Sequence, residues 1–292
     1  MKIIITGSLG NIGKPLTQKL IAKSHEVTVV SSQEDRKAAI NALGAKAAVG
    51  SVSDTEFLTN IFADADALFA MTPPNLGGSN VIANTVGAGK AFANAIKQSG
   101  IKRVVLLSSI GADLPSGNGP IKGLYEIEQL YNDIQDVSFT YLRAGYFYNN
   151  FYNDIPLIKN AGITGANIPA NATIPLVHTV DIATAAAEEL TQTTAKNNIR
   201  YIVSDVKTPT QVAAALGTAI GKPELPWVEF SNEEYLGGMT QAGVPEEIAA
   251  LYTEMGAGLA NGSIANDFIK SGAPVVGQTK LEEFAKEFAA TF

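Results

Sequence analysis

The sequence of 292 residues contains no cysteine and only two histidines, His25 and His178. Without cysteine there is no disulfide, no thiolate nucleophile and no cysteine-ligated metal, and a reducing cytoplasm is the simplest location to expect. No cluster of His, Asp and Glu has the spacing of metal ligands, and no arrangement of Ser, His and Asp indicates a hydrolytic triad. We therefore predict no metal site and no triad hydrolase.

Basic charge and long apolar runs are also scarce. The 21 Lys and Arg residues are outnumbered by 28 Asp and Glu residues, and the net charge of -7 argues against a surface that binds nucleic acid or anionic lipid. No segment reaches the ~20 apolar residues that span a bilayer, and the first apolar run stops after Ile5, unlike a signal peptide. We expect neither a nucleic acid nor a membrane as a partner, but a small-molecule substrate; the oligomeric state stays open.

The first two thirds of the chain alternate short apolar runs with stretches of helical periodicity, such as Leu16 and Leu20. The expected strands are residues 3–6, 27–30, 47–49, 67–71, 104–107, 138–142 and 200–203. Strands and helices in this alternation form a parallel sheet that is covered on both faces. The predicted fold class is therefore α/β, a Rossmann-like doubly wound parallel sheet.

The pattern changes near residue 205 to short helical segments broken by Gly and Pro. We expect residues 1–150, completed by 176–205, to form the nucleotide-binding domain. Residues 151–175 and 206–292 are expected to form a smaller, mostly helical lobe that walls a substrate cleft. The apolar stripe from Ile248 to Leu259 is assigned to packing inside this lobe rather than to binding.

A glycine-rich turn follows the first strand and opens the first helix. Gly7 permits a sharp turn, Gly10 lets backbone N–H groups approach a pyrophosphate, and Gly13 lets the helix pack closely. The helix N-terminus then faces the anion. This context predicts a dinucleotide site rather than a structural turn, formed by Gly7, Leu9, Gly10, Asn11, Ile12 and Gly13.

The end of the second strand bears on the choice of cofactor. An acidic residue there commonly bonds the ribose 2′-hydroxyl of NAD, but this chain has Ser31 and Ser32. These hydroxyls and the guanidinium of Arg36 suit a 2′-phosphate, which favours NADP(H) over NAD(H). The other interpretation is a solvated turn, in which Glu34 and Asp35 would oppose a phosphate.

Other strand ends supply further candidates, because ligands bind at the carboxyl ends of parallel strands. Ser51 is expected along the adenine, and Ser108 at the nicotinamide or in a local turn. Aromatic residues beyond the sixth strand are expected around a flat substrate. The remaining cofactor candidates are Met71, Thr72, Pro73 and Tyr146, and the substrate-pocket candidates are Tyr146, Phe147 and Phe151.

Four segments together resemble the NmrA-like branch of the atypical short-chain dehydrogenases/reductases: the glycine turn, residues 107–111, residues 141–150 and residues 180–183. The Arg-x-Gly-x-Phe-x-x-Asn pattern from Arg143 to Asn150 is the most specific of them. The resemblance covers essentially the whole chain. It implies an NADPH-dependent quinone or dye reductase, or a regulator that binds the dinucleotide without turnover.

The Tyr-x-x-x-Lys pair of the wider superfamily is missing. With Glu128 as the point of alignment, the two positions are Pro120 and Leu124, which neither donate a proton nor hold a ribose. A sugar-nucleotide epimerase is therefore disfavoured. Hydride transfer to a quinone-like or aromatic acceptor needs less acid catalysis, because delocalisation stabilises the reduced anion.

Three residues are candidates for proton donation, and each has an alternative. Tyr125, with Gln129 in place of the usual lysine, is otherwise a surface residue of a helix. Lys122 is otherwise solvated in a Gly- and Pro-rich loop. His178 is otherwise a structural histidine. The function predicted is an NADP(H)-dependent oxidoreductase, with a non-catalytic redox sensor as the alternative.

Overall fold

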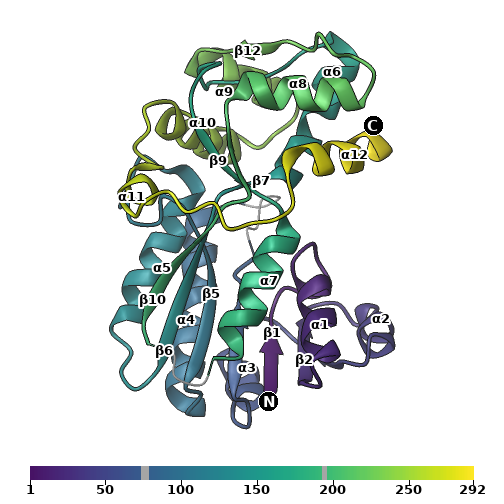
Figure 1. Cartoon of the computed structure of the whole chain (residues 1–292). Coiled ribbons are helices and arrows are strands. Elements are labelled where there is room, and N and C mark those ends of the chain that lie inside the picture. Colours follow the sequence, from purple (N-terminus) through teal and green to yellow (C-terminus); the bar gives the residue numbers. More distant parts are fainter. Residues whose placement is uncertain (74–78, 193–195) are drawn as a thin grey trace.

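The computed structural model describes residues 1–73, 79–192 and 196–292 of the chain. It has a layered α/β unit and, above the carboxyl ends of its strands, a smaller group of elements that includes the C-terminus (Figure 1). Among the described residues, no helix is long and apolar enough to cross a bilayer.

The large sheet has seven parallel strands in the described chain, in the order β10-β6-β5-β4-β1-β2-β3. The strands are β1 (Lys2–Ile5), β2 (Glu26–Ser31), β3 (Lys46–Val49), β4 (Ala67–Ala70), β5 (Arg103–Ser109), β6 (Ser138–Ala144) and β10 (Asn198–Ile202). Each overlaps one expected strand, so the predicted Rossmann-like fold class is confirmed. The chain turns from one side of the sheet to the other between β1 and β4, which is where such folds bind ligands.

Helices cover both faces of this sheet: α1 (Gly13–Ala22), α2 (Arg36–Ala42), α3 (Thr55–Phe62), α4 (Val81–Ser99), α5 (Lys122–Asn132) and α7 (Thr179–Leu190). Alternate residues of a strand face opposite sides. Ile3 and Ile5 accordingly pack with Leu16 of α1 and Ile182 of α7 in one core. Ile4 packs in the other core, with residues of α3, α4 and α5.

Residues 151–175 and 206–292, which we call the lobe, hold most of the remaining elements. These elements and their flanks are η1 (Gly119–Ile121), β7 (Tyr146–Phe147), η2 (Tyr148–Asp154), α6 (Ile155–Ala161), β8 (Thr164–Ala166), β9 (Ile174–Val177), β11 (Asp205–Lys207), α8 (Pro209–Ala219), β12 (Trp227–Glu229), α9 (Asn232–Gln241), α10 (Glu246–Ala260), α11 (Asn266–Lys270) and α12 (Leu281–Thr291). Strands β7, β9 and β11 form a small sheet, and β8 pairs with β12. The domain boundaries themselves remain a proposal.

An aromatic stack and two hydrogen bonds hold the C-terminal helix α12 against η2 and the small sheet. Tyr148 stacks on Phe284 of α12 with ring centroids 5.3 Å apart. The hydroxyl of Tyr148 donates to Asp205 at 2.8 Å, and the same carboxylate accepts from the backbone N–H of Leu281 at 2.8 Å. The first turn of α12 is thereby fixed beside β11 of the small sheet.

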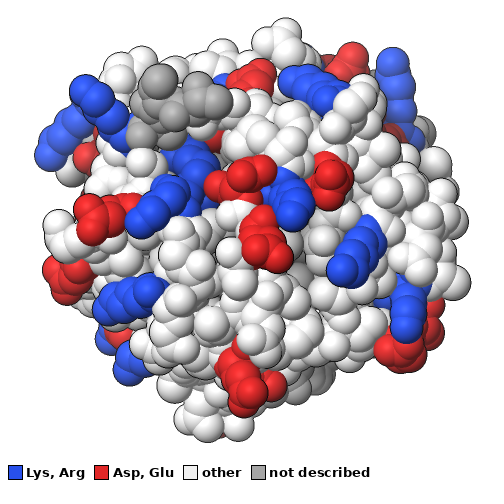
Figure 2. Space-filling model, turned by 90° about the horizontal axis from the view of Figure 1, so that it is seen from below, with Lys and Arg blue, Asp and Glu red and all other residues white. Residues whose placement is uncertain are grey.

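The face of the molecule opposite the lobe carries both kinds of charge. Figure 2 shows Lys and Arg side chains interspersed with Asp and Glu side chains over this face. A nucleic acid or an anionic bilayer is attracted by a broad basic area. The described side chains on this face form no such area.

Candidate functional site

The glycine-rich turn between β1 and α1 is shaped by its backbone. Gly7 has a φ of +96°, and a Cβ on Gly13 would lie 2.0 Å from the carbonyl oxygen of Ser8. A side chain at Gly13 is therefore incompatible with the present approach of α1 to the turn. A Cβ on Gly10 would meet only the Gly7 carbonyl oxygen, at 3.5 Å, so this point of the turn is open to a ligand.

The start of α1 is suited to an anion. Gly10 and Asn11 are exposed, whereas Ile12 is buried and Leu9 packs against the same core as α1. No side chain caps the helix at Ile12. In the first turn, the N–H of Lys14 donates to the Gly10 carbonyl oxygen at 3.1 Å and Pro15 has no N–H, so the N–H of Gly13 is the group that this turn can offer to a ligand such as a pyrophosphate.

Met71 and Thr6 join the turn to the end of β4. The N–H of Met71 donates to the Thr6 hydroxyl at 2.8 Å, and this hydroxyl lies 3.2 Å from the carbonyl oxygens of Phe69 and Met71. The side chain of Met71 lies directly against Gly7, where a Cβ would overlap its terminal methyl group. Thr6 was not among the residues expected at the site, although a threonine that directly follows a buried apolar strand was a visible signal.

Ser31 has a different role from the one expected. Its hydroxyl is buried, lies 3.2 Å from the Ser8 hydroxyl and exchanges hydrogen bonds with the backbone of Gln33. Ser8 has a φ of 55°, an unusual conformation for a residue with a side chain. Ser31 therefore holds the turn in shape rather than presenting a free donor to a phosphate.

The other cofactor candidates near β2 and β3 lie on the surface. Ser32 and Arg36 are exposed, and the Arg36 Nε donates to the Gln33 side chain at 3.3 Å. Ser51 is exposed, and its hydroxyl accepts from the N–H of Ser53 at 3.1 Å. Ser32 and Arg36 remain accessible to a charged ligand.

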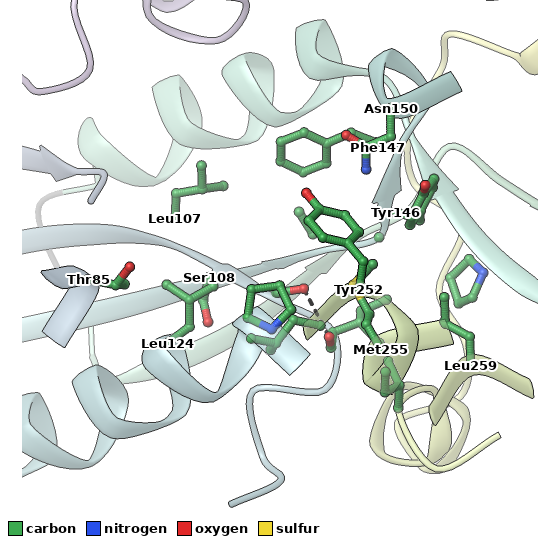
Figure 3. A pocket seen from close by; sticks show the side chains of 18 of the residues that line it. Thr85, Leu107, Ser108, Leu124, Tyr146, Phe147, Asn150, Tyr252, Met255 and Leu259 are labelled. Atoms are coloured by element: carbon green, nitrogen blue, oxygen red, sulfur yellow. Dashed lines mark hydrogen bonds between the residues drawn. The ribbon is translucent and has the colours of Figure 1, made fainter. Parts of the chain in front are cut away.

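A cavity of about 340 Å³ lies at the carboxyl edge of the large sheet. The sheet contributes Met71 and Thr72 after β4 and residues 107–110 of β5 and its end, while Tyr146 and Phe147 come from β7. The lobe supplies Tyr252, Met255 and Leu259 from α10 (Figure 3). Pro73 is exposed and lies outside the lining, directly before the undescribed residues 74–78. The cavity has the size of a small-molecule site.

Helix α10 is held over the cavity by two of its carboxylates. Glu247 accepts hydrogen bonds from the backbone N–H groups of Asn80 and Val81 at 2.7 and 2.8 Å, at the start of α4. Glu254 accepts from the N–H of Gly117 at 2.7 Å. Leu259 and Met255 pack in the core of the lobe as expected, and together with Tyr252 they also line the cavity.

No Lys, Arg, His, Asp or Glu is among the described residues that line this cavity. Its titratable groups are the phenols of Tyr146 and Tyr252, and desolvation raises the pKa of both above the ordinary value of 10.0. Neither phenol is ionised near neutral pH. The cavity therefore offers neutral hydroxyls and apolar walls, without a charged acid or base.

A buried charged network lies behind one wall. The Ser108 hydroxyl donates to Glu128 at 2.5 Å, and Arg143 binds the same carboxylate through contacts of 2.6 and 3.2 Å. Burial lowers the pKa of Arg143, but the hydrogen bonds and charge of Glu128 outweigh burial and hold it above its ordinary value. Arg143 also pairs with Asp267 of α11 at 2.8 Å. Ser108 lines the cavity, yet its proton is committed to Glu128.

The structure does not bring the three proton-donor candidates into the cavity. Tyr125 and Lys122 are partly exposed on α5 and are absent from its lining. The Nδ1 of His178 accepts from the N–H of Val180 at 3.2 Å and caps α7, and its Nε2 lies 3.4 Å from Glu287. His178 is thus a structural residue.

Two positions with no acid-base chemistry do line the cavity. Pro120 and Leu124, which stand at the places of the superfamily tyrosine and lysine, are both in its wall. Phe151, in contrast, was expected to line the substrate pocket but is not among the residues that line this cavity. It is buried behind Tyr146, with ring centroids 5.5 Å apart, and lines a separate, smaller cavity.

Comparisons with known proteins agree with this architecture. The model of the NmrA-like family matches residues 1–284. A curated relative, agroclavine dehydrogenase of Claviceps purpurea (strain 20.1), is 29% identical over 184 residues, so the match spans 61% of each chain.

Solved structures are similar over almost the whole chain. An NADPH-dependent quinone oxidoreductase from Escherichia coli, complexed with NADPH, superimposes with a TM-score of 0.84 at 20% identity, covering 98% of this chain and 99% of that one. The triphenylmethane reductase of Citrobacter sp., complexed with NADP(H), has a TM-score of 0.80 at 20% identity, with coverage of 98% and 99%. These likenesses establish the fold.

Proposed function

Because the chain belongs to the NmrA-like family, we propose that it is an NAD(P)H-dependent oxidoreductase that passes hydride to a flat conjugated acceptor such as a quinone. NADP(H) is the favoured cofactor. A reducing cytoplasm, inferred from the absence of cysteine, is part of the proposal.

The shape of the glycine turn supports a dinucleotide at this site. The open approach at Gly10 and the uncapped first turn of α1 suit a pyrophosphate. Ser32 and Arg36 are accessible for the ribose end, and no acidic residue ends β2. When bound, a reduced nicotinamide supplies the hydride. The residues proposed to hold the cofactor are Gly7, Leu9, Gly10, Asn11, Ile12, Gly13, Ser32, Arg36, Ser51, Met71, Thr72, Pro73, Ser108 and Tyr146.

The observation that carries the acceptor class is the cavity wall without charge. Its described residues include no charged group that can neutralise the alkoxide formed when an isolated ketone takes up hydride. A quinone or an extended dye spreads that charge over its own rings. The wall therefore suits acceptors whose own conjugated rings stabilise the negative charge formed on reduction.

Three aromatic side chains define the acceptor end. Phe147 and Tyr252 reach into the cavity from opposite walls, and Tyr146 lies at its end toward β7 (Figure 3). Flat rings pack well against such faces, and the apolar surface around them excludes water. These residues orient the acceptor, so that catalysis rests mainly on the alignment of two rings.

The proposal is tested by titration with NADPH and NADH, followed by steady-state oxidation of NADPH in the presence of a panel of quinones. We expect saturable binding, tighter for NADPH, and steady turnover with at least one quinone. Tight binding without turnover on any acceptor would favour the redox sensor instead. Failure to bind either dinucleotide would contradict both.

A further inference from the structure

A second, smaller cavity of about 40 Å³ lies directly behind the acceptor end of the large one. The two cavities share four lining residues, Tyr146, Tyr252, Met255 and Leu259. Tyr146 and Tyr252 thus stand between the two cavities, and each of these two tyrosines lines both of them. The small cavity is large enough for one or more water molecules.

Asp154, the last residue of η2, lines the small cavity. Within the described chain its carboxylate accepts one hydrogen bond, from the hydroxyl of Thr164 in β8, at 2.8 Å. The other titratable groups that line this cavity in the described chain are Tyr146 of β7, Tyr235 of α9 and Tyr252 of α10, and none of its lining residues is Lys, Arg or His. The carboxyl group therefore has no cation to hold it ionised.

A second polar residue at the small cavity is only partly satisfied by hydrogen bonds. Asn167 is buried, and its Nδ2 donates to the Asn232 side chain and to the Thr253 carbonyl at 2.7 and 2.8 Å. Its Oδ1 accepts no hydrogen bond within the described chain. Buried carbonyl oxygens of this kind are commonly satisfied by ordered water.

We propose that Asp154 is the proton reservoir for reduction of the acceptor, and that Tyr146 passes its proton from the small cavity into the large one. This inference rests on the proposed function. The Asp154 carboxyl protonates a water in the small cavity, that water protonates the Tyr146 hydroxyl as its own proton leaves, and the acceptor oxygen receives the proton. Asp154 acts through Tyr146 and does not itself touch the acceptor.

The electrons and atoms balance for a quinone. The reduced nicotinamide gives a hydride and is oxidised, and the quinone gains two electrons and one hydrogen to become a hydroquinone monoanion. One proton from Asp154 completes the hydroquinone, and the Asp154 carboxylate regains a proton from solvent. An acceptor that carries its own positive charge differs, because hydride alone makes it neutral and no proton is required.

The electrostatics of the small cavity agree with this role. Desolvation raises the pKa of Asp154 from 3.8 to about 6, and the hydrogen bond from Thr164 offsets it only in part. The charge of Asp154 adds to desolvation in raising the pKa of Tyr146 and Tyr235, so these groups lie within electrostatic reach of each other. A carboxylic acid that titrates near neutral pH is well matched to proton donation.

The test compares two acceptors over pH 5 to 8: a quinone, which needs the proton, and a cationic triarylmethane dye, which does not. With the wild-type protein, kcat for the quinone is expected to fall about tenfold per pH unit above the carboxyl pKa, while kcat for the dye stays level. In Asp154→Asn, which keeps an acceptor for Thr164, we expect quinone kcat at pH 6 to fall about a hundredfold. Dye kcat should change less than about twofold, and the pH inflection should disappear.

Two controls keep the outcomes distinct. Asp64→Asn, at an exposed carboxylate away from both cavities, should leave both acceptors unchanged. The wild-type protein should show a solvent deuterium isotope effect with the quinone and none with the dye, a readout that does not depend on how a variant folds. Equal slowing of both acceptors in Asp154→Asn, a retained inflection, or no isotope effect overturns the relay and leaves the proposed function standing. NADPH oxidation by neither acceptor overturns the proposed function itself.

Discussion

The two ends of the cleft are built in different ways. At the glycine turn the shape comes from backbone, because Gly7 and Gly13 occupy positions where a Cβ would overlap Met71 and Ser8. At the acceptor end it comes from side chains of α10, which begins at Glu246 and folds back over the sheet. The first end is built around contiguous glycines, with Ser31 and Met71 packed against them, and suits a constant cofactor. The second is set by a helix remote in sequence, so its acceptor can change without altering the first.

The largest effect is expected from a change at the glycine turn, where the backbone sets the shape of the cleft. Gly13→Ala places a methyl group against the Ser8 carbonyl oxygen, so the turn must open, and we expect NADPH affinity to fall at least about a hundredfold. Fluorescence titration of the cofactor measures this loss. The matched control is Gly87→Ala on an exposed turn of α4, where a Cβ meets nothing within 4 Å and helix stability should rise by about 0.5–1 kcal/mol. Equal affinities in the two variants would contradict the assigned role of the turn.

At the acceptor end, the pH dependence of protein stability tests whether the carboxyl group of Asp154 is desolvated. The folded-state pKa of Asp154 is raised to about 6, so the folded protein binds more protons than the unfolded chain between about pH 4 and 6, and stability falls as pH rises through that range. Asp154→Asn removes this penalty and should raise the free energy of unfolding at pH 8 by about 1–3 kcal/mol, with little effect at pH 4. Urea unfolding at both pH values tests it. A difference that does not depend on pH would show that the carboxyl is not desolvated.

A substitution at Tyr252 should affect acceptor binding and leave cofactor binding unchanged. Tyr252→Ala removes an aromatic wall of the cavity and should raise the quinone KM about tenfold, while the Kd for NADPH changes less than about twofold. Tyr252→Phe retains the ring and should keep KM near the wild-type value. Steady-state kinetics and cofactor titration separate the two effects. Equal loss of cofactor and acceptor binding would mean that the ends are not independent.

The smallest expected effect concerns the cofactor's ribose end. Arg36 is exposed, so removing its charge should weaken NADPH about fivefold and leave NADH unchanged. Lys97→Ala, at an exposed lysine near the end of α4, controls for the change in net charge. Titration of both dinucleotides decides the matter. Parallel loss of NADPH and NADH affinity would remove Arg36 from the 2′-phosphate site.

Much of the fold could be predicted because its signals are local. Alternation along β1 divides Ile3 and Ile5 from Ile4, and this pattern is a property of four consecutive residues. The positive φ of Gly7 and the close packing at Gly13 likewise follow from neighbours in sequence. Ligand contacts of the glycine turn stay predictions, since they depend on a cofactor.

The parts that could not be predicted depend on distant contacts. Periodicity in α10 indicates an apolar face, but it does not tell whether Tyr252 and Met255 meet another helix or a cavity. Phe151 follows Tyr146 closely in the sequence, yet the Phe151 side chain is buried behind the Tyr146 ring. Ser31 was expected to face a phosphate, and only the folded turn brings the Ser8 hydroxyl to it.

In the proposed reaction, a dinucleotide on the glycine turn delivers hydride into the adjoining cavity. Its most direct test is the rate of NADPH oxidation with a saturating quinone, measured for the wild-type protein, Gly13→Ala and Gly87→Ala under the same conditions. We expect turnover by the wild-type protein and by Gly87→Ala, and loss of turnover in Gly13→Ala. Equal rates in all three, or no oxidation by the wild-type protein, would contradict it.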